Sequence, residues 1–239
     1  MDIYSKGTLV AGREVVMKSI FSDKATVIIR AMLSEPKRQW TVRDFEKEFN
    51  VGRSRAAQVL AELRKKGFVG GVASGRLAYS QLTDREGLIK EWLRVYSFEF
   101  NENHLYFSED DILKKMKSYL QNKKWDDKYA LTLHTGANLI SNYVNTLVTY
   151  CYLDSELFKE MSLEIRQALN LKELKTGGNV CFIKPYYKNS VFLHKQEIKD
   201  FPVVSNLQLY LDLYHFPQRG REHADYLLKV LKEKGVELG

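Results

Sequence analysis

Residues 41–69 read TVRDFEKEFNVGRSRAAQVLAELRKKGFV, and this stretch decides the fold of the N-terminal third of the chain. Thr41 is a residue type that caps helix N-termini, and it precedes a short amphipathic segment. Residues 50–52 predict a tight break, and a longer basic helix follows from 53 to 66, closed by Gly67. The positions predicted to face a core are Val42, Phe45, Phe49, Ala56, Val59, Leu60 and Leu63.

A short helix, a turn and a longer basic helix form the helix-turn-helix pattern. A helix over 23–32, ended by Pro36, comes before it. After it, the turn Ser74-Gly75-Arg76 predicts a hairpin with residues 77–82 as the returning strand. We therefore expect a winged helix-turn-helix at 40–82, similar to the winged-helix domains of many bacterial transcription regulators.

The net charge of the protein is +7, and it is unevenly distributed. Residues 1–82 hold 15 Lys and Arg against 8 Asp and Glu, whereas residues 83–239 hold 22 of each. The excess therefore belongs to the segment with the helix-turn-helix pattern. A polyanion such as duplex DNA is the partner that this asymmetry favours.

The second helix of the motif supplies the candidates for DNA recognition. Arg55 and Gln58 lie one turn apart, and their side chains can fork onto guanine and adenine. Arg76 at the wing tip suits a minor groove. The residues predicted to contact or frame the DNA backbone are Thr41, Arg43, Arg53, Ser54, Lys65 and Lys66. A solvated basic face, or a winged helix used for protein contacts, is the alternative.

The sequence of residues 83–239, whose net charge is zero, predicts an α+β domain with a mixed sheet. Residues 83–100 read as a connecting helix, and 101–239 as the domain itself, so the predicted divisions are 1–82, 83–100 and 101–239. Strands are expected at 103–107, 129–133, 146–153, 179–183 and 190–193, and helices at 109–122, 135–142, 206–215 and 221–234.

The same remainder offers no clear catalytic motif. Its histidines form no metal-binding pattern, and the pair Gly177-Gly178 lacks the residues that cradle phosphates. Neither Cys151 nor Cys181 has a basic neighbourhood that would mark a nucleophile. Asp154, at the end of a predicted strand, is most simply a turn residue. We therefore predict no enzyme activity, no cofactor and no metal.

No apolar run is long enough to span a bilayer, and residues 1–16 do not have the pattern of a secretory signal. With only two cysteines, far apart in the sequence, a disulfide framework is not expected. The expected location is the cytoplasm, with no membrane partner.

Residues 205–224 place polar groups among closely spaced apolar ones, which indicates buried hydrogen bonds that hold two helices together. The arginines of this segment are expected to pair with Asp212 or Glu222 in a structural role. The polar and glycine positions that define the motif are Gln208, Tyr210, Asp212, Arg219, Gly220, Arg221 and Glu222.

This motif, behind a winged helix, resembles the AbiEi-type antitoxins of type IV toxin-antitoxin systems, an abortive-infection family. The stretches 131–138 and 179–180 are also similar to that family, although His134-Thr135-Gly136 replaces its more usual run of small residues. The resemblance implies an autorepressor that binds inverted repeats in its own promoter. It further implies an antitoxin that counteracts a nucleotidyltransferase toxin without a stable complex.

Two other functions fit the residues alone. A nucleic-acid enzyme, a nuclease or nucleotidyltransferase, would use Asp154, Asp212 and Glu222 as metal ligands. A ligand-sensing transcription regulator would hold a small molecule in the second domain. Oligomeric state, operator sequence and the identity of the toxin are left open by the sequence.

Overall fold

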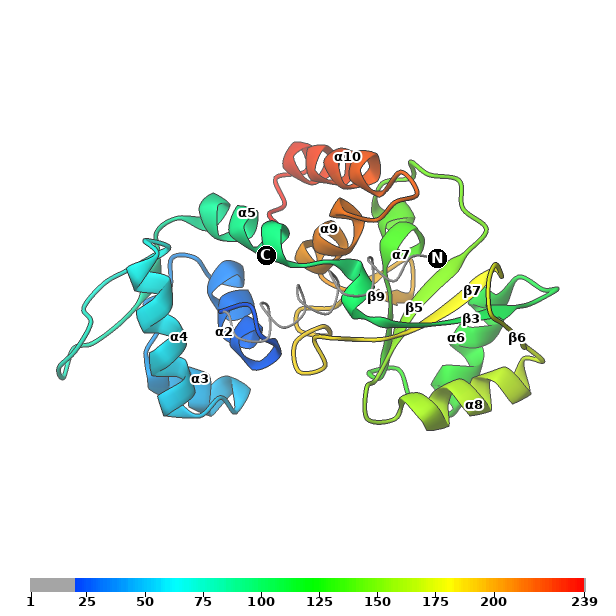
Figure 1. Ribbon diagram of the computed structural model, residues 1–239, viewed down its shortest axis with the longest axis horizontal. Helices are drawn as coiled ribbons and strands as arrows, with labels where there is room; N and C mark the ends of the chain where they lie inside the picture. Colours follow the sequence, from blue (N-terminus) through cyan, green and yellow to red (C-terminus); the bar gives the residue numbers. More distant parts are fainter. Residues whose placement is uncertain (1–19, 239) are drawn as a thin grey trace, which may run out of the picture. The chain divides into compact units, whose positions relative to one another are not determined.

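The computed structural model describes residues 20–238 (Figure 1). Residues 1–19, which include the stretch 1–16 considered above for a signal sequence, and residue 239 lie outside the described part. The chain divides into two compact units, the first ending at Tyr96 and the second running from Ser97 to Leu238. Within residues 20–238 no helix has both the length and the apolar character needed to cross a membrane.

The first unit has the predicted winged helix-turn-helix arrangement. Its helices are α2 (Asp23–Ser34), α3 (Val42–Phe49), α4 (Arg53–Lys65) and α5 (Arg85–Val95), and its sheet pairs β1 (Val69–Gly70) with β2 (Gln81–Leu82). The core is filled by aromatic and aliphatic side chains, and Phe21 stacks on Trp92 while Trp40 stacks on Phe45. Burial of these large apolar groups is the main source of stability for the unit.

The α3-turn-α4 segment forms as its sequence predicts. Thr41 and Asp44 make a reciprocal capping box, in which the Thr41 hydroxyl accepts from the Asp44 N–H and the Asp44 carboxylate accepts from the Thr41 N–H. Asn50 adopts the left-handed conformation, with φ 53°, and ends α3. The predicted inward positions of α4 are all buried: Ala56, Val59, Leu60 and Leu63.

The wing is shorter than the sequence predicted. The returning strand occupies only two residues, and Leu77, expected within it, is 81% exposed. Beyond β1 and β2 the two arms of the wing are joined by one backbone bond from the Tyr79 N–H to the Val72 carbonyl. Gly71, with φ 113°, bends the chain away from regular strand geometry, which explains why the ladder ends early.

The second unit is built on a mixed seven-stranded sheet, and the chain is therefore an α+β protein as predicted. The strand order is β6-β3-β7-β5-β4-β9-β8; β5 and β7 are parallel, as are β4 and β9, and the other neighbours are antiparallel. The strands are β3 (Glu102–Phe107), β4 (Tyr129–Leu131), β5 (Thr149–Leu153), β6 (Lys172–Leu174), β7 (Val180–Lys184), β8 (Gln196–Ile198) and β9 (Phe201–Val203).

Helices cover both faces of this sheet (Figure 1). One face carries α6 (Ile112–Asn122) and α8 (Phe158–Ala168), and the other carries α7 (Leu133–Ile140), α9 (Asn206–Tyr214) and α10 (Gly220–Glu233). A short 3₁₀ turn, η1 (Phe98–Phe100), begins the unit. The central strands β4, β5 and β7 are almost completely buried, as expected for strands covered on both sides.

Several sequence predictions for the second unit need correction. The strand expected at 190–193 is wrong, because these residues form consecutive hydrogen-bonded turns. The helix expected from residue 109 begins only at Ile112, since Asp111 caps it with its side chain. Helix α8, strand β6 and the hairpin of β8 and β9 had no predicted counterpart.

Candidate nucleic-acid interface and buried polar core

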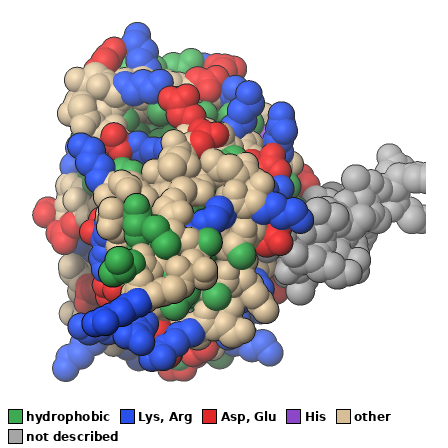
Figure 2. Space-filling model, turned by 90° about the vertical axis from the view of Figure 1, so that its left-hand side faces the viewer, with side chains coloured by type: hydrophobic (Ala, Val, Ile, Leu, Met, Phe, Trp, Pro, Cys, Tyr) green, Lys and Arg blue, Asp and Glu red, His purple; other side chains and the backbone are tan. Residues whose placement is uncertain are grey.

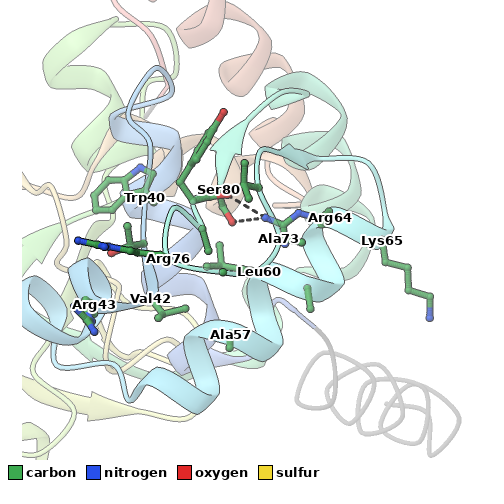
Figure 3. Close-up of a pocket in the computed structure, with 16 residues that line it drawn as sticks. Trp40, Val42, Arg43, Ala57, Leu60, Arg64, Lys65, Ala73, Arg76 and Ser80 are labelled. Atoms are coloured by element: carbon green, nitrogen blue, oxygen red, sulfur yellow. Dashed lines mark hydrogen bonds between the residues drawn. The ribbon is translucent and has the colours of Figure 1, made fainter.

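A groove with a volume of about 1040 Å³ lies between α3, α4 and the wing of the first unit. Its lining mixes polar and apolar groups, and the apolar ones include Ala57, Leu60 and Val72. Arg43 and Arg76 lie at one end of it, and Lys65 extends outward at the other (Figure 3). On the side of this unit shown in Figure 2, lysine and arginine side chains, with acidic side chains among them, lie around a surface of backbone and hydrophobic groups.

The groove brings together some of the residues predicted to contact DNA. Thr41, Arg43, Lys65 and Arg76 line it. The three basic side chains are exposed, and none has an ion-pair partner among residues 20–238. Such unpaired cations next to a concave surface are suited to phosphate groups.

Other predicted residues lie on α4 outside the groove, and their side chains divide into two groups. Ser54 and Gln58 are exposed on the outward side of the helix. Arg53 pairs with Glu46 at 2.6 Å, and Lys66 lies 3.6 Å from Glu91. These two ion pairs are exposed and therefore weak, so both cations are still available to a phosphate.

Arg55, predicted to read a base, lies on the side of α4 that meets α2. Its Nη2 donates to the Ser22 hydroxyl at 2.6 Å, while the residue as a whole stays exposed. Arginine carries five N–H donors, so this bond orients the guanidinium and leaves donors over for another partner.

Arg64 was not among the predicted residues, yet it lines the groove. Its Nη2 donates to the Ser80 hydroxyl at 2.7 Å and to the Tyr79 carbonyl at 3.3 Å. The sequence signal that could have predicted a role for Arg64 is its position on α4, one turn after Leu60, which also lines the groove. The partner could not have been found that way, because it lies 16 residues further along the chain.

In the second unit the motif at 205–224 forms a buried hydrogen-bond network around Asp212, whose side chain is completely buried. The Asp212 carboxylate accepts from the Thr132 hydroxyl at 2.6 Å, the Tyr152 hydroxyl at 3.1 Å and the Gln208 amide at 2.7 Å. These donors come from the β4–α7 junction, β5 and α9. The prediction of buried hydrogen bonds is confirmed. Those of Asp212 join α9 to the sheet, while His223 of the same segment joins α10 to α7 through its contact with His134.

The arginines of the motif lie on the surface. Arg219 pairs with Glu222 at 2.8 Å, as predicted, and its guanidinium also lies over the Tyr143 ring. Arg221 pairs with Asp225 at 3.0 Å and not with Asp212 or Glu222, so this part of the prediction is wrong. The reason is helical spacing, because residues four apart on α10 are neighbours.

Gly220 and Tyr210 take structural positions at the corner between α9 and α10. A Cβ at Gly220 would lie 2.4 Å from the Leu213 carbonyl oxygen, so the two helices can approach this closely only because the side chain is absent. Tyr210 is buried, and it meets Tyr214 edge to face. The motif therefore builds the α9–α10 corner.

Two buried histidines join α7 to α10. Their Nδ1 atoms lie 2.8 Å apart, while His134 Nε2 faces the Gln218 carbonyl at 2.7 Å and His223 Nε2 faces the Ser141 carbonyl at 3.1 Å. A carbonyl can only accept, so each Nε2 must donate, and the contact between the two Nδ1 atoms needs one further proton. The pair can therefore hold at most one positive charge, and burial lowers the pKa of both rings, that of His223 to about 4.

This pair makes stability depend on pH. Between pH 6.5 and about 4 both rings become protonated in the unfolded chain, whereas the folded chain takes up at most one proton there. The free energy of unfolding should therefore fall as the pH falls, by about 1.4 kcal/mol per pH unit for each proton of difference. Urea unfolding at pH 7.0 and 5.5 should show a smaller loss in the His223→Gln variant, and an equal loss in both would contradict the assignment.

Asp154 acts as the sequence suggested, since its Oδ1 accepts from the backbone N–H groups of Glu156 and Leu157 and so forms a turn. Among residues 20–238 no three His, Cys, Asp or Glu side chains form a group that could hold a metal ion, so the acids of the enzyme alternative do not converge. Cys151 and Cys181 are buried, and burial raises the pKa of the Cys181 thiol to about 12. Neither is an activated nucleophile.

The protein therefore belongs to the class in which a winged helix-turn-helix unit is followed by an α+β unit built on a mixed sheet. A family model described as a transcriptional regulator, the AbiEi antitoxin of type IV toxin-antitoxin systems, matches residues 81–232. The match covers more than half of the chain, and the chain belongs to this family. The matched range begins at β2 and extends into α10, so it leaves out α2, α3 and α4. Comparison with curated proteins gives no match, and neither does comparison with solved structures.

Proposed function

We propose that this protein is a cytoplasmic antitoxin that represses its own operon. The first unit binds repeats in the promoter as double-stranded DNA, and the second unit counteracts a nucleotidyltransferase toxin without forming a stable complex with it. Membership of the AbiEi family supports the antitoxin and regulator roles. The groove of the first unit supports the DNA-binding role.

The observation that carries the DNA-binding proposal is the placement of Arg43, Lys65 and Arg76 around the groove. Helix α3, helix α4 and the wing each bring one of these cations to one surface, and α4 turns Ser54 and Gln58 outward beside it. A helix with such an outward face fits the major groove, while the flanking cations meet phosphates.

Charge balance supports DNA binding by the first unit. Residues 83–239 carry equal numbers of acidic and basic side chains, so this part offers no general attraction to a polyanion. The toxin-directed role therefore needs a different surface chemistry, and we assign it to the second unit because the family match lies almost wholly there.

Binding of the intact chain to its own promoter tests the regulator role. The expected result is tighter binding to a promoter duplex than to a random duplex of equal length, with affinity that falls steeply as salt rises. Equal affinity for the two duplexes would exclude a specific repressor. For the antitoxin role, co-expression with the nucleotidyltransferase of the same operon should restore growth, and continued growth arrest would exclude it.

Arg55 and Gln58 are the proposed base-reading residues, and they should affect specificity more than general affinity. Arg55→Lys keeps the charge but loses the planar fork that grips guanine, and Gln58→Ala removes the amide. Each change should cost about 1–3 kcal/mol on the promoter duplex and almost nothing on a random duplex. Fluorescence anisotropy with both duplexes measures the difference, and a uniform loss would reassign the residue as a phosphate contact.

A further inference from the structure

Arg64 joins helix α4 to the wing through its guanidinium. It lies in the last turns of α4, half-buried, and its Nη2 reaches the Ser80 hydroxyl at 2.7 Å and the Tyr79 carbonyl at 3.3 Å (Figure 3). Arg64 therefore differs from its neighbour Lys65, which is exposed and points outward from the same helix. The two cations sit next to each other in the sequence but have different surroundings.

Ser80 is the point at which three parts of the first unit meet. Its backbone exchanges two hydrogen bonds with Trp40, both at 2.7 Å, in the segment that leads into α3. Its hydroxyl accepts from Arg64 on α4, and the residue is only 3% exposed. Ser80 also lies directly before β2, the returning strand of the wing. The contact between Arg64 and Ser80 thus fixes α4, the start of α3 and the base of the wing to one another.

The wing has little other regular structure to hold its shape. Strands β1 and β2 are two residues long, and the segment between them is exposed from Gly71 to Leu77. Arg76, the cation of the wing, lies in that segment. Its distance from Arg43 and Lys65 therefore depends on how the base of the wing is held against α4.

We propose that Arg64 is a positioning residue for DNA binding, one that sets the wing against α4 and does not itself contact a phosphate. The inference rests on the proposed DNA-binding function of the first unit. Both acceptors are reached by one nitrogen, Nη2, whose two N–H bonds have directions fixed in the guanidinium plane, unlike those of a freely rotating lysine ammonium. Holding the wing in place before the DNA arrives lowers the entropy cost of binding, so the effect is on affinity and not on the number of phosphates neutralised.

The decisive variant is Ser80→Ala, because it removes the shorter of the two hydrogen bonds, from Arg64 Nη2 to the Ser80 hydroxyl, without changing any charge. It should lower affinity for the promoter duplex about tenfold, since a hydrogen bond to a charged group is lost. The slope of log affinity against log salt concentration should stay as in the wild type, because that slope counts phosphate contacts. Arg64→Ala also removes the longer bond to the Tyr79 carbonyl, so it should give at least this loss with the same slope, and the double variant should be no weaker than Arg64→Ala alone.

Lys65→Ala is the matched control, being the adjacent cation on the same helix. It should flatten the salt slope by about 0.9, as expected for one lost phosphate contact. If Arg64→Ala flattens the slope in this way and Ser80→Ala has no effect, Arg64 is a phosphate contact and the proposal is overturned. If Arg64→Ala does not fold, Arg64→Lys replaces it, with a loss and an unchanged slope expected.

Hydrogen exchange separates this inference from the proposed function. In the Ser80→Ala protein without DNA, the amides of residues 72–79 should exchange faster than in the wild type, while those of α9 should not change. Unchanged exchange in the wing would overturn the role of Arg64 as a positioning residue even if the promoter is bound. A wild-type protein that does not prefer its promoter would instead overturn the proposed function, and the exchange result would still decide whether Arg64 holds the wing.

Discussion

Asp212→Ala should lower the free energy of unfolding by about 4 kcal/mol, the largest stability effect expected in the second unit. The carboxylate is completely buried and accepts hydrogen bonds from Thr132, Tyr152 and Gln208. Removing it takes away their shared acceptor, and each buried donor that loses a partner costs about 1–3 kcal/mol. The sum is smaller than three full penalties because the donors belong to one network and partly compensate for each other.

Urea unfolding followed by circular dichroism measures this loss, and hydrogen exchange locates it in α9 and β5. Asp212→Asn keeps the size of the side chain and one acceptor oxygen, so its loss should be smaller. The matched control is Asp225→Ala on α10, an exposed aspartate paired with Arg221. This surface pair should contribute less than about 1 kcal/mol. Equal losses in Asp212→Ala and Asp225→Ala would show that the buried network contributes no special stability.

The winged helix could be predicted in detail because its signals are local. The Thr41 cap, the Asn50 break and the inward positions of α4 each depend on residues within one or two helical turns. The length of the wing strands could not be predicted in this way. Gly71 and the exposed Leu77 lie in a stretch whose local sequence pattern is also compatible with a longer strand. Whether the ladder continues there is decided by pairing across the hairpin.

The elements missed in the second unit had signals of unequal strength. Helix α8 carries its buried residues at helical spacing, at Phe158, Met161 and Ile165, so the sequence held enough information to predict it. Strand β6 has three exposed residues and shows no alternation. The β8–β9 hairpin turns through Lys199 and Asp200, both with positive φ, without the glycine or asparagine that usually announces such a turn.

The buried hydrogen-bond networks of the second unit could not be predicted from local sequence patterns, because most of their contacts join residues far apart in the chain. His134 meets His223 across 89 residues of sequence, and Asp212 meets Thr132 across 80. The contact between Gln208 and Asp212, at 2.7 Å, joins residues four apart on α9, so helical spacing alone could have predicted it. Helical spacing could not predict that Tyr152 of β5 also donates to Asp212, since that contact depends on the order of the strands in the sheet.

The triple replacement of Arg43, Lys65 and Arg76 by glutamine should weaken promoter binding on the order of 100-fold near physiological salt. The three side chains line one groove, are exposed, and have no ion-pair partner among residues 20–238. Each neutralised phosphate contributes about 0.9 to the slope of log affinity against log salt, so the slope should flatten by about 2.7. Because the residues are exposed and unpaired, the stability of the first unit should change by less than about 1 kcal/mol.

The matched control replaces Lys229, Lys232 and Lys234, at the C-terminal end of α10, by glutamine. It reduces the net charge from +7 to +4, the same as the groove variant, but the removed cations lie in the second unit. If binding depends on where the charge sits, the control should keep nearly all of its affinity and its salt slope. Equal losses in the two variants would mean that net charge alone draws the protein to DNA, and the groove would then have no special role.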